Sequence, residues 1–196
     1  SGSMALLADA GHNLSDVLGL VMAWGATALA RRRPSPRFTY GLRSSSILAA
    51  LFNAVLLLVA VGAIVVEAVR RLMDPSPVAA GVVMAVAAAG IAINALTAWM
   101  FASGRKGDLN IRGAYLHMAA DAAVSLGVVV AALVMMFTGW AWLDPVVSLV
   151  ISAVIVAGTW GLLRDSTSMA LHAVPPGLDL RAVEAQLLAR PGVVRV

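Results

Sequence analysis

Five long apolar stretches alternate with short polar breaks along the 196-residue chain. Each stretch holds about 20 or more predominantly apolar residues, the length that a helix needs to cross the hydrocarbon core of a bilayer. The breaks contain prolines, glycines and charged residues, which end helices or turn the chain. The pattern therefore predicts five membrane-spanning helices, over residues 4–30, 45–70, 77–103, 109–138 and 143–163.

Two aspartates stand where the fourth and fifth of these helices are expected to begin. Asp108 directly precedes the fourth stretch, and Asp144 lies at the start of the fifth, followed by Pro145. An aspartate side chain accepts hydrogen bonds from the first free N–H groups of a helix, and proline is favoured at the first helical position. We therefore expect Asp108 and Asp144 to cap their own helices.

The composition supports a membrane protein. Hydrophobic residues make up 61% of the chain and charged residues 12%, about half the charged share of an average soluble domain. The sequence predicts an all-α membrane protein, a bundle of five transmembrane helices whose main partner is the lipid bilayer. Its basic residues form short clusters rather than one basic face, so nucleic acid is not an expected partner. The sequence holds no cysteine, which excludes disulfides and thiolate metal ligands from it.

Basic residues in the breaks predict the orientation. The break at 31–43 holds five arginines, and Arg105, Lys106 and Arg112 follow the third stretch. Because cytoplasmic loops carry the excess of Lys and Arg, these two breaks are expected in the cytoplasm. Residue 1 is then expected outside, which predicts a preceding helix and a parent protein with six spans. The short loops and the Ala-, Val- and Arg-rich composition fit a bacterial inner membrane.

The chain changes character after the fifth stretch. Residues 164–196 are mixed polar, and Leu180, Val183, Leu187 and Leu188 would share one face of a short amphipathic helix. The final PGVVRV is typical of a turn that enters a β-strand. One helix and one strand cannot bury a core. We therefore expect a transmembrane domain over 1–165 and, over 166–196, the truncated beginning of a cytoplasmic domain.

Two copies of one motif carry the candidate chemistry. HNLSD at 12–16 and HMAAD at 117–121 each set a histidine and an aspartate four residues apart inside an apolar stretch. On a helix, residues i and i+4 lie on the same face. Ionisable groups at membrane depth cost roughly 2.5–3.5 kcal/mol each on insertion scales, so such residues indicate a function. A hydrogen-bonding pair between helices is the simpler alternative for any one of them.

The predicted topology brings the two motifs together. The first and fourth spans run in opposite directions, so His12 is expected level with Asp121, and Asp16 level with His117. Two imidazoles and two carboxylates in alternation suit tetrahedral zinc, whereas magnesium, calcium and manganese favour oxygen ligands alone. The sequence does not separate zinc from cadmium or cobalt. Histidine exchanges protons near neutral pH, so proton uptake is expected when the metal leaves.

The chain resembles the cation diffusion facilitator family of zinc transporters. The resemblance rests on ALLADAGHNLSD at 5–16, FTYG at 38–41, ILAALFNAVLLL at 47–58 and the second HxxxD motif. It implies a six-helix, usually homodimeric antiporter that exchanges Zn²⁺ for H⁺ by alternating access, with a ferredoxin-like α+β cytoplasmic domain. By motif, the implied transport-site ligands are His12, Asp16, His117 and Asp121. The chain departs from relatives in lacking a histidine-rich insertion near 103–113.

Other polar residues are accessory candidates. Asp9 lies one turn before His12 and could relay protons, support the site or lie at its outer mouth. Asn53 and Asn94 could line the path or support the ligands, although polar contacts between helices are the favoured interpretation, as for Ser125. His172 is more readily a solvated surface residue than a peripheral ligand. The glycines of GTWG at 158–161 are expected to permit close helix contacts.

Three functions compete. The leading hypothesis is a Zn²⁺/H⁺ antiporter that exports zinc from the cytoplasm. A non-transporting membrane metal sensor is the second, and an intramembrane zinc hydrolase is the third. A hydrolase needs an open coordination position and a general base. The sequence has no HExxH motif, and its two glutamates, Glu67 and Glu184, are remote from both motifs. We therefore do not expect an enzyme.

Overall fold

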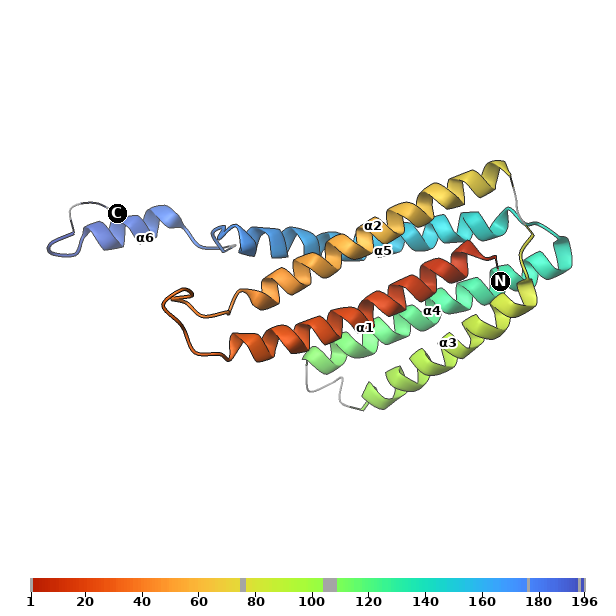
Figure 1. The fold of residues 1–196 in the computed structure, drawn as a ribbon, viewed down its shortest axis with the longest axis horizontal. Coiled ribbons are helices and arrows are strands. Elements are labelled where there is room, and N and C mark those ends of the chain that lie inside the picture. Colours follow the sequence, from red (N-terminus) through yellow and green to blue (C-terminus); the bar gives the residue numbers. More distant parts are fainter. Residues whose placement is uncertain (1, 75–76, 104–108, 176, 194, 196) are drawn as a thin grey trace.

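Five long helices and one short helix make up the part of the chain that the structure, a computed structural model, describes (Figure 1). That part comprises residues 2–74, 77–103, 109–175, 177–193 and 195. The helices are α1 (Met4–Ala30), α2 (Ser45–Met73), α3 (Ala80–Phe101), α4 (Leu109–Thr138), α5 (Leu143–Ala170) and α6 (Leu180–Leu188). The first five are all long and apolar enough to cross a membrane, which confirms the predicted all-α membrane protein.

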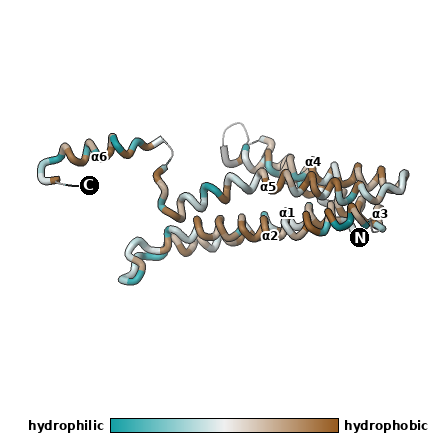
Figure 2. Tube along the Cα trace, turned by 90° about the horizontal axis from the view of Figure 1, so that it is seen from above, coloured by the Kyte–Doolittle hydropathy of each residue, from teal (hydrophilic) through white to brown (hydrophobic). Residues whose placement is uncertain are grey.

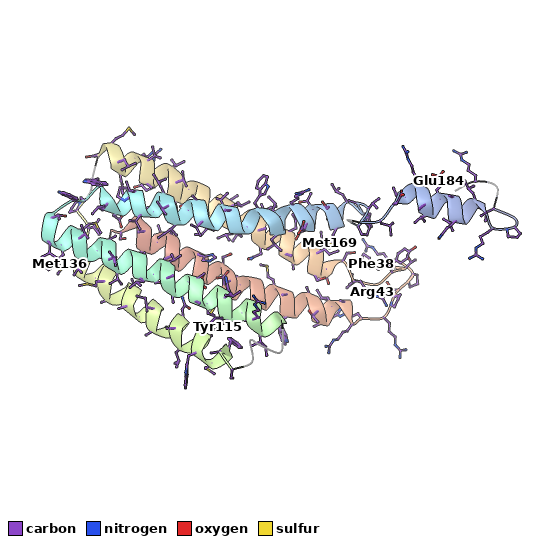
Figure 3. All side chains as sticks on the ribbon, turned by 180° about the vertical axis from the view of Figure 1, so that it is seen from behind. Phe38, Arg43, Tyr115, Met136, Met169 and Glu184 are labelled. Carbon is purple, nitrogen blue, oxygen red and sulfur yellow. The ribbon has the colours of Figure 1, made fainter. Side chains whose placement is uncertain are left out.

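The membrane helices form two closely packed pairs with α1 between them. α3 packs along α4 and α2 packs along α5, while α1 contacts both pairs (Figure 1). Figure 2 shows apolar residues along the bundle and hydrophilic ones in the turn between α1 and α2 and on α6. Figure 3 marks the two ends of the bundle: Met136 lies at one, and Phe38 and Arg43 lie at the other. We refer to the second end as cytoplasmic, following the orientation predicted from the basic loops.

The packed core lies in the outer half of the bundle. The first turns of α1 are buried there and contribute Met4, Ala5, Leu6 and Ala8. Apolar residues of the other four membrane helices surround them: Leu57, Val61, Ile64, Val83, Ala87, Val128, Ala132, Met135, Ile151 and Ile155. The rest of α1 is mostly exposed, including Leu20 and Trp24. Exposed apolar side chains are expected where a helix faces lipid. The helices are therefore in tight contact at the outer end and looser toward the cytoplasmic end.

Helix boundaries follow the hydropathy pattern except at the end of α5. The predicted bounds of the first and fourth helices agree with α1 and α4. α2 continues from the predicted end at 70 to Met73, and α3, at Ala80–Phe101, is shorter at both ends than the predicted 77–103. The predicted end of the fifth helix at 163 is wrong, because α5 continues to Ala170. Its last two turns are polar but contain no glycine or proline, so the helix leaves the apolar layer without ending. The domain boundary predicted after residue 165 falls inside α5 and stays a prediction.

Asp144 does not cap its own helix. α5 begins at Leu143 with Trp142 as its N-cap, so Asp144 lies within the first turn. Its carboxylate instead accepts hydrogen bonds from Ser3 and from backbone N–H groups at the start of α1. This is possible because α1 and α5 both begin at the outer end, where the two N-termini lie next to each other. The other predicted cap, Asp108, lies outside the described residues.

The C-terminal segment contains the predicted amphipathic helix. α6 spans Leu180–Leu188, and the Asp179 side chain caps it by accepting a hydrogen bond from the Arg181 backbone N–H (2.9 Å). The strand predicted over 191–196 is not found among the described residues there, and residues 194 and 196 lie outside the description. Gly192 is part of a turn with φ +89°, which bends the chain where a strand was expected.

Candidate metal site

The four predicted ligands converge between α1 and α4. Across the two helices, His117 Nε2 lies 3.2 Å from Asp16 Oδ2, and His12 Nε2 lies 3.5 Å from Asp121 Oδ1. Within each helix, the histidine Nε2 lies 3.7 Å from an oxygen of the aspartate one turn later. Imidazoles and carboxylates therefore alternate around one point, the order expected from antiparallel helices. We call these four residues the tetrad.

The spacing of the donor atoms suits a tetrahedral ion. Two atoms that each lie about 2.1 Å from a tetrahedral zinc ion are about 3.4 Å apart. The four distances in the tetrad run from 3.2 to 3.7 Å, with Asp121 facing His12 through Oδ1 and His117 through Oδ2. His12, Asp16 and Asp121 offer ligand atoms that all lie within 4.8 Å of one another. The His12 and His117 rings stand edge to face, with their centroids 6.0 Å apart. His117 is not part of this group of three, although its Nε2 lies 3.2 Å from Asp16 Oδ2 and 3.7 Å from Asp121 Oδ2.

Burial differs among the members of the tetrad. Asp121 is 3% exposed, whereas the His117 side chain is 45% exposed. Two buried polar atoms, His12 Nδ1 and Asp121 Oδ2, have no hydrogen-bond partner among the described residues. Leaving a buried polar atom unpaired costs about 1–3 kcal/mol, and more when the group is charged. A cation bound to the tetrad would satisfy the unpaired carboxylate oxygen.

A cavity of about 370 Å³ adjoins the tetrad. α2 contributes Asn53, Ala54 and Leu57 to its wall, and α5 contributes residues from Ile151 to Leu162. α5 begins at the outer end, so its lining residues follow one another from Ile151 toward Leu162 in the direction of the predicted cytoplasm. The cavity therefore extends from the tetrad in that direction. One water needs roughly 10–15 Å³ of such space, so the cavity has room for a partly hydrated ion.

The outer side of the tetrad is closed. Asp9 is 5% exposed and lies one turn outward from His12. Its Oδ2 accepts a hydrogen bond from Ser125 Oγ on α4 (2.8 Å), and its carbonyl oxygen accepts one from Asn13 Nδ2 (2.9 Å). Asp9 therefore joins α1 to α4 directly beside the tetrad, under the packed outer core. Its support of the site and any proton relay stay predictions.

Asn53 makes the polar contact between helices that the sequence favoured. Ser15 Oγ on α1 donates to Asn53 Oδ1 on α2 (3.4 Å), and Asn53 also lines the cavity. Gly19 makes room for it, since a Cβ at this position would lie 2.9 Å from Asn53 Nδ2. Sequence reasoning missed this contact between Gly19 and Asn53, because nothing in the order of residues shows which side chain a helical glycine accommodates.

The remaining candidates lie away from the tetrad. Asn94 is buried on α3 and, within the described residues, does not line the cavity, so its role stays a prediction. His172 is exposed beyond the end of α5, with a positive φ of 55°. The interpretation of GTWG as a close helix contact is wrong, because a Cβ on Gly158 or Gly161 would meet no atom within 4 Å. Gly158 and its neighbour Thr159 instead form part of the cavity wall.

The close approach of Asn53 to Gly19 leads to a stability prediction. Gly25→Ala, in the same helix with open space around the new Cβ, is expected to stabilise the protein by about 0.5–1 kcal/mol through helix propensity. Gly19→Ala gains the same propensity but displaces Asn53, so it should be less stable than Gly25→Ala by about 1–2 kcal/mol. Thermal unfolding of both variants in detergent measures the difference. Equal melting temperatures would show that Asn53 does not depend on Gly19.

Comparison with known proteins decides the family. The family model described as the cation efflux transmembrane domain matches residues 1–170, which include all five membrane helices and the tetrad. The chain belongs to the cation efflux family. This confirms the resemblance to the cation diffusion facilitators, and α6 lies beyond the matched domain. The five apolar helices and the bacterial relatives described next identify an integral protein of the bacterial inner membrane.

Several relatives of this cation efflux domain are curated bacterial proteins. It is 40% identical over 191 residues to the cation efflux system protein CzcD of Alcaligenes sp. (strain CT14), covering 97% of this chain and 60% of that protein. It is 40% identical over 188 residues to the zinc transporter ZitB of Escherichia coli (strain K12), covering 95% and 60%. The cadmium, cobalt and zinc/H(+)-K(+) antiporter of Bacillus subtilis (strain 168) is 33% identical over 198 residues, covering 100% and 64%. The chain thus spans about three fifths of the length of these relatives.

Proposed function

We propose that this protein exports zinc from the cytoplasm in exchange for protons, through the tetrad, by alternating access. One observation carries the proposal: two imidazoles and two carboxylates from antiparallel membrane helices alternate at 3.2–3.7 Å around a point that adjoins a cavity. A structural zinc site would have no need of such a cavity, whereas a transported ion needs a path to its ligands. Homodimer formation, which the family resemblance implies, stays a prediction.

Zinc is the proposed substrate because the donor set and its spacing match it. Nitrogen and oxygen ligands at tetrahedral spacing suit Zn²⁺, and cobalt and cadmium accept the same ligands. The printed names of relatives agree: one is called a zinc transporter, and another names cadmium, cobalt and zinc. We therefore propose Zn²⁺ as the main substrate, with Cd²⁺ and Co²⁺ as alternatives.

The shape of the bundle supports loading from the cytoplasm. The cavity lies between α1 and α4, which carry the tetrad, and the α2–α5 pair, which forms the opposite wall. The outer ends of the same helices are packed together around Met4, Ala5 and Leu6. This arrangement corresponds to an inward-facing state. Release to the other side requires the outer ends to separate while the cytoplasmic ends approach each other.

Charge balance supports exchange for protons. Zn²⁺ bound to two carboxylates and two neutral imidazoles leaves the tetrad without net charge, whereas the empty tetrad places two carboxylates in the membrane. Uncompensated charge is costly at membrane depth. Protons that bind when zinc leaves would remove this cost on the return step. The ligands must in turn lose their protons for the metal to bind.

The affinity for zinc is therefore expected to fall as the pH is lowered. Histidine in water titrates near pH 6.5, so acidification from pH 7.5 to 6 places protons on imidazoles that zinc must displace. For two such histidines the apparent affinity should weaken about tenfold. Calorimetry at both pH values, each in two buffers of different ionisation enthalpy, measures the affinity and the number of protons released. Equal affinity at both pH values without proton release would contradict the exchange.

Flux in sealed vesicles tests the proposal itself. The whole chain is reconstituted into liposomes that contain a zinc-sensitive dye, and external zinc is added with and without an imposed pH gradient. Zinc uptake that accelerates when the lumen is acidic supports the antiporter. Zinc binding without flux would identify a sensor. Peptide cleavage would identify a hydrolase, against which stands the position of both glutamates: Glu67 pairs with Arg71 (3.2 Å), and Glu184 lies on α6.

A further inference from the structure

The beginning of α1 is held by side chains from both helices of the α2–α5 pair. Asp144 of α5 accepts hydrogen bonds from Ser3 Oγ and from the backbone N–H groups of Met4 (2.6 Å) and Ala5 (3.4 Å). Arg71 of α2 donates to the carbonyl oxygen of Gly2. We call these contacts, which join Asp144 and Arg71 to residues 2–5, the outer clasp.

Asp144 is completely enclosed in the outer clasp. It is 1% exposed, and Ser3, Met4 and Ala5 are each at most 5% exposed. The first N–H groups of a helix have no partner within the helix, and they carry partial positive charge. A buried carboxylate placed against them makes charge-assisted hydrogen bonds and loses them when it moves away. The bonds therefore exist only while the N-termini of α1 and α5 remain in contact.

The carboxylate is not needed merely to cap α1. Ser3 already occupies the N-cap position, and its Oγ accepts a hydrogen bond from the Leu6 backbone N–H (3.0 Å). α5, by contrast, begins without a side-chain cap of its own. Asp144 thus joins α1 to α5, two helices that form opposite walls of the cavity. These are the helices that must separate at the outer end if the tetrad is to open outward.

We propose that Asp144 is a positioning residue that keeps the outer side closed and so favours the inward-facing state. The inference rests on the function proposed above. When the outer side opens, the carboxylate must leave the α1 backbone and become hydrated. Removing its charge should therefore shift the protein toward outward-facing conformations, without any change to the tetrad.

Single cysteines in this cysteine-free chain can report the shift. Thr159→Cys places a thiol in the cavity wall, and Ser148→Cys places one at a fully buried outer position one turn from Asp144. Labelling rates with a charged maleimide are measured on the metal-free protein in detergent. Asp144→Asn should raise the ratio of labelling at position 148 to labelling at position 159 about tenfold, as expected from the loss of one charge-assisted hydrogen bond.

The ratio of the two rates separates the proposal from simple loosening. Asp144→Glu should restore the original rates in part, and Asp165→Asn, at an exposed carboxylate of the same helix, should leave both unchanged. If Asp144→Asn does not fold, Ser3→Ala removes one donor and should raise the same ratio about threefold. A ratio that does not change, as when labelling becomes equally faster at both positions, would overturn the proposal. Because no metal is added, either result is independent of whether the protein transports zinc.

Discussion

Asp121→Ala is expected to abolish zinc binding and leave the metal-free protein at least as stable as the wild type. Asp121 contributes the most buried oxygen atoms of the tetrad, and one of them has no hydrogen-bond partner among the described residues. The alanine loses the 3.5 Å contact between Asp121 and His12, but it also relieves the cost of burying a carboxylate with one unpaired oxygen, and the two effects offset each other. Loss of a ligand should weaken zinc binding by at least about a hundredfold, since partners that only orient ligands are worth roughly 10–100-fold.

Calorimetry and thermal unfolding together test this expectation. Zinc at a hundred times its dissociation constant should stabilise the wild type by about 2.7 kcal/mol. The variant should show no shift in melting temperature on zinc addition, while its zinc-free melting temperature is unchanged or raised. Asp165→Ala, which removes an exposed carboxylate from the cytoplasmic end of α5, is the matched control and should bind zinc normally. Zinc binding by Asp121→Ala with wild-type affinity would place the metal elsewhere.

Gly158→Trp is expected to slow zinc flux at least about tenfold, equivalent to about 1.4 kcal/mol in the barrier. Gly158 lines the cavity, and the space around its missing Cβ is open for 4 Å. An indole at this position would occupy the path between the cytoplasmic end and the tetrad. The equilibrium affinity for zinc should stay within about threefold of the wild type, because no ligand is changed. The variant therefore separates the path from the site.

Gly161→Trp provides the comparison for the blocked cavity. Gly161 lies three residues further along α5, has equally open surroundings and, within the described residues, does not line the cavity. Both variants add the same bulk to the same helix. Vesicle flux and calorimetry on the pair should show slow flux for Gly158→Trp alone. Equal flux in the two variants would mean that zinc reaches the tetrad by another route.

The tetrad could be predicted from the sequence because its geometry depends on two simple regularities. Residues four apart share a helix face, and antiparallel helices reverse the order of the two ligand types. Those two facts place His12 beside Asp121 and Asp16 beside His117, as the structure has them. Metal binding by these residues stays a prediction. The cavity beside them could not be foreseen, because it depends on how the α2–α5 pair packs against α1 and α4.

Two errors at helix ends have physical causes. Hydropathy reports where a helix leaves the apolar layer, whereas a helix ends where its backbone can no longer continue. α5 therefore extends through the polar Arg164 and Asp165, which the hydropathy pattern assigned to another segment. Capping rules describe local partners, so they assigned Asp144 to its own helix. Its actual partner, the Met4 backbone, lies 140 residues earlier in the chain, and only the tertiary structure shows that the two helices begin side by side.

α5 is one unbroken helix, so a tilt of the helix displaces its two ends by different amounts. From Asp144 to Ala170 the helix rises about 39 Å at 1.5 Å per residue, and it contains no proline beyond Pro145. If it pivots near the tetrad, beside Ile151 of the cavity wall, a tilt of about 10° moves the cytoplasmic end by about 5 Å and the outer end by about 2 Å the other way. The cavity wall near Thr159 then moves by roughly half as much as the cytoplasmic end. A rearrangement of a few ångströms around the ion is thus amplified at the cytoplasmic surface, where the polar last turns of α5 precede α6.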